Sequence, residues 1–440
     1  MNLSDLATCF EGVFPSSIAT RAPDGMPNIS YLSHVVQVDD QRVALSNQFF
    51  TKTTANLRSD PHAMIMIVEP ITGKQYQLAV TWQESIDHGP LFLKIEAQLD
   101  ASSAQIGMAD VMRLRAVDIF LVEEIRPVAS DVPADRRAKE QPDLVELAAT
   151  MRRLGDLTDP AQLLTELLAI VRESFGFEHA MVLLSDQDRK VSTVAASLGY
   201  ESRCVGAEVA HGVGLIGKVA AGGCSMRINE MTRIRRMGTA VLESSPPIEL
   251  RQAILPGLAD AMSQIAVSLT LQGEVHGVLF VESRERFAFD TAMAAAIELA
   301  AQYAAALLSL HQNAVEDTAT SPLKPERLQS QGNRAISVLY HRFDHSVFID
   351  RGYVIKGVAG QILLHMLRRK LDEAQVNFTN REIRVSMADV LPDFKDNLET
   401  RLLLLRRRLD ELQLPIRLLH MGRGRLRLEI QGQVDIRVED

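Results

Sequence analysis

Cysteine and tryptophan are scarce in this chain of 440 residues, which contains three cysteines and one tryptophan. Cys9, Cys204 and Cys224 lie far apart in the sequence and form no CxxC pair. Their number and spacing exclude a disulfide framework and a zinc site built from thiolates. The first residues, MNLSDLATCFEGVF, lack the basic and apolar regions of a signal peptide. We therefore expect a cytoplasmic protein.

The sequence also lacks the motifs of common enzyme classes. It contains no HExxH, no GxSxG and no Walker loop, and no pair of acidic residues stands out as an acid–base pair. We therefore predict no catalytic residues and no metal site. This scarcity favours a regulatory protein over an enzyme.

One apolar segment is as long as a membrane span, residues 291–310, TAMAAAIELAAQYAAALLSL. It is rich in alanine, which is weakly hydrophobic and a strong helix former, and it contains Glu298 and Gln302. These features predict a soluble helix that is buried in a homodimer, rather than a helix that crosses a membrane.

The composition is that of a folded, multidomain chain, since hydrophobic residues make up 46% and charged residues 23%. A length of 440 residues predicts about three domains. Polar linkers rich in proline and charge at about 127–142 and 313–332 separate them. The predicted class is multidomain α+β, with domains at residues 1–128, 143–312 and 333–440.

The sequence pattern of the first domain predicts short strands separated by turns. Partial alternation and many β-branched residues predict a small antiparallel barrel. We expect one helix, at 52–60, and strands at 15–22, 28–38, 42–47, 63–69, 76–85 and 91–102.

Thr51, Lys52 and Thr53 stand together at the start of the expected helix. The amides and the positive dipole at a helix N-terminus favour an anion, so a phosphate is one interpretation. The other interpretation is that Thr51 caps the helix beside a solvated lysine.

Residues 14–128 resemble the pyridoxamine-phosphate-oxidase-like, FMN-binding split-barrel family. The resemblance is carried by IATRAPDGMPNISYLS, FFTKTTANLRSDPHAMIMI and TGKQYQLAVTW. It implies a homodimer with FMN at the barrel interface. By this resemblance Lys52 binds the flavin phosphate, Thr51 supplies the preceding hydroxyl, and Gln75 approaches the flavin ring.

Two departures from the family pattern concern the phosphate site. Thr53 replaces a second basic residue, and the strand MPNISYL lacks the usual basic ligands. We expect FMN as the cofactor and no vitamin oxidation. Heme ranks below flavin, because His34, His62 and His88 have no partners at ligand spacing.

Residues 143–312 resemble a GAF domain, which implies a module that binds a small molecule or dimerises. The resemblance rests on HGVGLIGKVAAG, residues 211–222, and on SLTLQGEVHGVLFVESRERFAFD followed by a long helix. The glycines of the first motif lack the spacing of a dinucleotide site, and they indicate a tight turn into a short helix.

The C-terminal domain has the opposite charge balance from the whole chain. Residues 331–440 hold 19 basic and 15 acidic residues, whereas the chain holds 47 and 56. Leucines 398, 402, 405, 409 and 412 recur at helical spacing and predict a buried stripe on a helix at 395–412.

Basic side chains gather on that helix and on the hairpin that follows it. We expect those of the helix to face outward together and those of the hairpin to share one face of a strand. The candidate DNA-binding residues are Asn397, Arg401, Arg407, Arg408, Arg423, Arg425 and Arg427.

Residues 340–431 resemble the winged helix of response-regulator output domains. The resemblance is carried by FTNREIR, LETRLLLLRRRLDE and PIRLLHMGRGRLRLE. It implies that 395–412 is a recognition helix in the major groove and that 420–428 is the wing. The alternative is a solvated arginine-rich helix, or one that pairs with an acidic partner.

Together these patterns predict a cytoplasmic, homodimeric transcription regulator. Its split barrel and GAF domain would sense a small molecule, a cofactor or a redox state, and its winged helix would bind double-stranded DNA. The alternative is a flavin-dependent oxidoreductase with a regulatory GAF domain and a protein-interaction domain.

Overall fold

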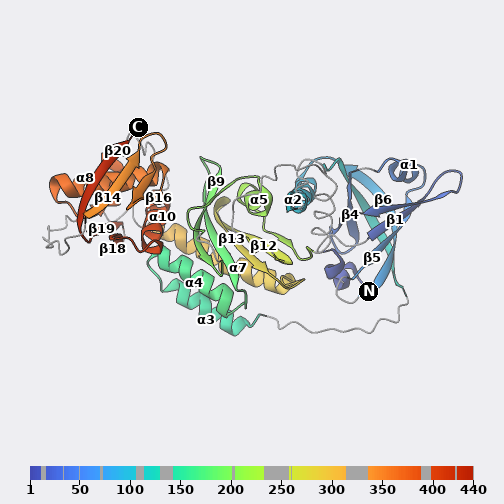
Figure 1. The fold of residues 1–440 in the computed structure, drawn as a ribbon. Helices are drawn as coiled ribbons and strands as arrows, with labels where there is room; N and C mark the ends of the chain where they lie inside the picture. Colours follow the sequence, from blue (N-terminus) through green and yellow to red (C-terminus); the bar gives the residue numbers. More distant parts are fainter. Residues whose placement is uncertain are drawn as a thin grey trace. The chain divides into compact units, whose positions relative to one another are not determined.

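The computed structural model contains four sheets in its described residues, one in each of the first two predicted domains and two in the third (Figure 1). It describes residues 1–10, 16–32, 34–48, 50–69, 73–105, 113–128, 142–200, 204–231, 257–258, 260–313, 335–387, 398–421 and 424–439.

The N-terminal domain is built on a seven-stranded sheet with the strand order β2-β1-β5-β6-β7-β4-β3. Every strand pair in it is antiparallel. Its elements are η1 (Leu3–Phe10), β1 (Ser16–Arg21), β2 (Pro27–Leu32), β3 (Val35–Gln37), β4 (Arg42–Asn47), α1 (Lys52–Ser59), β5 (His62–Val68), β6 (Gln75–Ile86), α2 (Pro90–Gln105) and β7 (Ala116–Pro127).

The prediction of a strand at 91–102 is wrong, because these residues form helix α2. Phe92, Ile95 and Leu99 are buried at three- and four-residue steps, which is helical spacing, and Pro90 suits the first turn of a helix. The strand that pairs with β6 is instead β7, which the sequence analysis did not identify. The helix expected at 52–60 is confirmed as α1.

The middle domain places helices before and after a sheet with the strand order β10-β9-β8-β13-β12-β11. Its elements are α3 (Leu144–Gly155), α4 (Pro160–Glu173), β8 (His179–Asp186), β9 (Val191–Leu198), β10 (Glu208–Ala210), α5 (Gly214–Gly222), β11 (Met226–Ile228), β12 (Ser263–Leu271), β13 (Glu274–Ser283) and α7 (Thr291–Asn313). Gly212 and Gly214 have positive φ values of 85° and 61°, as expected of a tight turn into α5.

Helix α7 contains the long apolar segment. The stretch Thr291–Leu310 has a mean hydropathy of 1.5 and is long enough to cross a membrane, and half of it is buried within the protein. A core helix has the same length and composition, so this single segment is weak evidence for a membrane span.

The C-terminal domain combines a four-stranded sheet, β16-β15-β14-β20, with a three-stranded sheet, β17-β19-β18. Strand β20 runs parallel to β14 and the other pairs are antiparallel. The elements are β14 (Ala335–His341), β15 (Val347–Ile349), β16 (Gly352–Ile355), α8 (Gly357–Glu373), β17 (Asn377–Thr379), α9 (Asn380–Ser386), α10 (Leu398–Glu411), β18 (Ile416–His420), β19 (Arg425–Ile430) and β20 (Gln433–Glu439).

The predicted leucine stripe is confirmed in α10. Leu398, Leu405 and Leu409 are fully buried, Leu402 is 4% exposed, and Leu412 packs against the same core. Thr379 begins α9 with a capping box, in which its hydroxyl accepts from the Glu382 amide while the Glu382 carboxylate accepts from the Thr379 amide. These local features fix where the helices begin and which side of α10 faces the core.

Candidate functional site

The first candidate site is a hollow of about 440 Å³ on the N-terminal sheet. Ile18, Ile65 and Leu78 form one cross-strand row that is fully buried on the core face. Strand alternation puts the next row, Ala19, Met64 and Ala79, on the opposite face. Two of these side chains are methyl groups, so this second row leaves room for a ligand.

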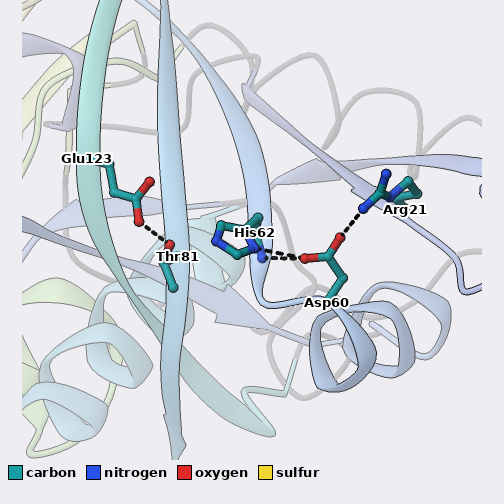
Figure 2. A network of polar contacts seen from close by, with 5 residues as sticks. All are labelled: Arg21, Asp60, His62, Thr81 and Glu123. Atoms are coloured by element: carbon teal, nitrogen blue, oxygen red, sulfur yellow. Dashed lines mark hydrogen bonds and ion pairs between the residues drawn. The ribbon is translucent and has the colours of Figure 1, made fainter.

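Polar side chains at this hollow and beside it come from four separate parts of the chain (Figure 2). The Asp60 carboxylate lies 2.9 Å from His62 Nδ1 and accepts a hydrogen bond of 2.8 Å from Arg21. The hydrogen bond with His62, followed by that from Arg21, lowers the pKa of Asp60 to about 2. On the neighbouring strand pair, the Thr81 hydroxyl donates to Glu123.

This hollow joins an apolar floor to a polar rim. An apolar lining with a few polar groups is typical of sites that bind small molecules. Among the rim residues, only His62 was singled out from the sequence. Glu123 was missed because it lies on β7, which was not predicted, and Arg21 and Asp60 were missed because no local pattern shows that the end of β1 meets the residue after α1.

The predicted flavin residues divide into two groups. Thr51 and Lys52 are exposed at the N-terminus of α1, as a phosphate site requires, and the Thr51 side chain makes no capping hydrogen bond. Thr53 is 1% exposed, and its hydroxyl lies 2.7 Å from that of Ser30 and accepts from Asn28. Thr53 therefore links α1 to β2. The interpretation that the Thr51 side chain caps the helix is wrong, because that side chain makes no capping hydrogen bond.

Gln75 is exposed at the start of β6, where it pairs with Val68. His62 lies at the other end of β5, about 20 Å away at roughly 3.3 Å per residue. The structure therefore places Gln75 and the polar rim at opposite ends of the same strand pair.

The three histidines named as heme candidates occupy different settings. His34 is buried, His62 belongs to the rim, and the exposed His88 lies 2.6 Å from Asp87. Across the described ranges, no three His, Cys, Asp or Glu residues form a group that could hold a metal ion.

The second candidate site is the arginine-bearing side of α10. Arg401 Nη2 lies 3.8 Å from the Asp186 carboxylate at the end of β8. Arg406 pairs with Asp159, the residue that caps α4. These two contacts join the C-terminal domain to the middle domain within one compact unit of the chain.

Two further arginines of α10 also have internal partners. Arg407 donates to the carbonyl of Ala161 and to the Thr165 hydroxyl, the latter at 2.7 Å. Arg408 donates to the carbonyl of Val354 at 3.1 Å and to Glu411 at 2.8 Å. Burial lowers the pKa of Arg407 to about 10.

The expectation that Arg401, Arg407 and Arg408 face outward together is therefore wrong, because each of them contacts another part of the protein. Sequence periodicity shows which side of a helix is apolar, but it does not show what covers the other side. Arg406, which the sequence analysis did not select, makes an ion pair in this contact.

The hairpin residues fit the predicted alternation. Arg425 and Arg427 are partly exposed on one face of β19, whereas Leu426 and Leu428 are buried on the other. Asn397 and Arg423 lie outside the described residues.

Glu399, in the first turn of α10, is a partly buried carboxyl close to this contact. It accepts a hydrogen bond from Asn380 and lines a small hollow with Asp159 and Arg406. Burial raises the pKa of Glu399 to about 7, against the opposing influence of Arg384.

Two family models match separate parts of the chain. Residues 6–123 match a model described as pyridoxamine 5'-phosphate oxidase, and residues 158–309 match a GAF domain model. The chain therefore has an N-terminal domain like that of the oxidase family and a GAF domain, and this much of the sequence-based prediction is confirmed.

Solved structures similar to this chain cover the same two parts. An FMN-binding protein from Syntrophomonas wolfei subsp. wolfei is 17% identical and covers 29% of this chain and 88% of its own, with a TM-score of 0.25. The GAF domain of an Acinetobacter phosphoenolpyruvate-protein phosphotransferase is 18% identical and covers 40% and 96%, with a TM-score of 0.33. No curated protein matches the chain.

We predict that the stability of the protein depends on pH through Glu399. An unfolded glutamate titrates near pH 4.3, so between about pH 4 and pH 7 the folded state retains a proton that the unfolded state has lost. Stability that is present below this range is therefore lost as the pH rises through it. Glu399→Gln removes the titration and should flatten this decline.

Thermal unfolding midpoints of the full chain between pH 5 and pH 8 measure this effect. Asp410→Asn, an exposed change on the same helix, is the matched control. A decline as steep in Glu399→Gln as in the unaltered protein would contradict the assignment.

Proposed function

We propose that the protein is a ligand-responsive transcription regulator whose C-terminal domain binds double-stranded DNA. The GAF domain and the oxidase-like domain support the sensing part, because both match modules that bind small molecules. The observation that supports the output part is the element order of the C-terminal domain. A helix, a strand, two helices and a hairpin, α8-β17-α9-α10-β18-β19, follow one another as in a winged helix.

Charge on the hairpin supports a nucleic-acid partner. Arg425 and Arg427 share one face of β19, and Arg417 is exposed on the neighbouring strand β18. Guanidinium groups spaced along a hairpin suit the phosphates of a duplex. In this proposal α10 supplies the recognition helix and the hairpin supplies the wing.

We further propose FMN as the ligand of the N-terminal domain. Thr51 and Lys52, exposed at the start of α1, would hold the phosphate, where the helix dipole favours negative charge. When bound, FMN supplies redox chemistry, and this domain would then report the redox state of the cell. Thr53 fits only a supporting role, because its hydroxyl already contacts Asn28 and Ser30.

Exposed apolar side chains support a homodimer. Ile29 and Tyr31 on β2 are 71% and 83% exposed, and Leu144 and Leu299 on helices α3 and α7 are 74% and 58% exposed. Ile29 and Tyr31 share one face of β2, and exposed apolar side chains that adjoin one another in this way are typical of association interfaces. On this basis we propose that the protein is a homodimer. We also propose that it is cytoplasmic, since its proposed partner is DNA.

The alternative is a flavin-dependent oxidoreductase. The observation that favours it is the rimmed hollow of the N-terminal sheet, which joins His62 and Glu123 to an apolar floor. Oxidation of a reduced nicotinamide by the purified yellow protein would support this alternative over a purely sensory domain.

We predict that Lys52→Ala lowers the amount of FMN retained by the protein, because it removes the one cation at the start of α1 that the oxidase resemblance assigns to the phosphate. Absorbance near the flavin maximum after reconstitution with FMN measures occupancy. Lys94→Ala, an exposed lysine of α2 in the same domain, is the control. Equal occupancy in both variants would remove Lys52 from the site.

We predict that the protein binds a mixed-sequence DNA duplex with an affinity that falls as salt rises. Arg425→Ala should weaken binding several-fold and reduce the salt slope by about 1, since one phosphate contact is lost. Fluorescence anisotropy at several salt concentrations measures both quantities.

Arg437→Ala is the control for this measurement, because Arg437 is exposed on β20 and pairs with Asp435. Absence of duplex binding at low salt would overturn the proposed function.

A further inference from the structure

We propose that the GAF helix α4 is an internal competitor of DNA for the arginines of α10. This inference rests on the proposed function, because it concerns the state in which α10 is not free to bind DNA. The contacts of Arg401, Arg406 and Arg407 with the middle domain carry it.

The acceptors on the GAF domain resemble what a phosphate backbone offers to arginine. Asp159 provides a carboxylate to Arg406, Asp186 provides a second carboxylate near Arg401, and the first turn of α4 provides the Ala161 carbonyl to Arg407. Anionic and carbonyl oxygens are the groups that guanidinium ions bind in DNA complexes as well. A guanidinium that is held here is not available to a duplex.

The charged side chains in this contact are largely buried, unlike those of a chance surface ion pair. The side chains of Arg406 and Asp159 are 14% and 12% exposed, and the Arg401 side chain is 18% exposed. Burial alone would raise the pKa of Asp159, but the hydrogen bond and charge of Arg406 outweigh it and lower the pKa. Partly desolvated charges persist only when their partners are well placed, so the two surfaces are matched to each other.

The position of the acceptors couples the contact to the sensing domain. Asp159 and Thr165 belong to α4, and Asp186 ends β8, a central strand of the GAF sheet. A small molecule that binds the GAF domain more tightly when α10 is detached would raise the affinity for DNA, and DNA would raise the affinity for that molecule by the same factor.

The test is the double variant Asp159→Asn and Thr165→Val. Asparagine is as good an N-cap as aspartate but removes the charge that faces Arg406, and valine removes the hydroxyl that accepts from Arg407. Neither residue belongs to the proposed DNA surface. Glu173→Gln on the same helix removes one negative charge from an exposed pair with Arg172 and is the matched control.

We expect the double variant to bind a mixed-sequence duplex about tenfold more tightly than the unaltered protein, which is within the usual range of coupling between sites. The control should bind as the unaltered protein does. Equal affinity of the double variant and the unaltered protein would overturn the competition but leave DNA binding in place. Absence of duplex binding in all three proteins would overturn the proposed function itself.

Hydrogen exchange of the unaltered protein provides a second readout that does not depend on the variants. Amides in the segment 159–166 should exchange faster after a saturating amount of duplex is added, because α10 leaves them. Unchanged exchange in this segment on a protein that binds the duplex would also overturn the competition.

Discussion

A guanidinium group that leaves water must find oxygen acceptors, and this constraint organises the contact between the C-terminal domain and the middle domain. Leucines on one side of α10 bury the helix in the C-terminal core, which leaves Arg401, Arg406 and Arg407 on the side that faces the middle domain. There the N-terminus of α4 supplies a carboxylate, a carbonyl and a hydroxyl. The same helix therefore packs into the C-terminal core on one face and contacts the middle domain on the other.

The N-terminal domain and the GAF domain differ in the polar groups that they present. The N-terminal sheet offers an open hollow with an apolar floor and a rim in which Asp60 joins Arg21 to His62. The GAF domain contributes the acceptors that hold α10. The proposed coupling of a GAF ligand to the arginines needs no intermediate element, since Asp159 caps α4 and Asp186 ends β8.

Local patterns predicted more of this protein than its long-range contacts did. The leucine spacing of α10, the turn before α5 and the alternation of β19 all follow from neighbouring residues, and all appear in the structure. The segment 91–102 was misassigned because a run of apolar residues suits either a strand or a helix until its partner is known. The contact between Arg406 and Asp159 joins residues 247 positions apart, and no local pattern reports it.

The most direct measurement is a double-mutant cycle between Asp159→Asn and Arg406→Met, read from the free energy of unfolding of the full chain. Because these side chains pair while partly buried, the account predicts that the two losses are not additive and that the coupling energy exceeds about 0.5 kcal/mol. Additive losses would show that α4 does not hold the arginines of α10, and the account would be contradicted at its centre.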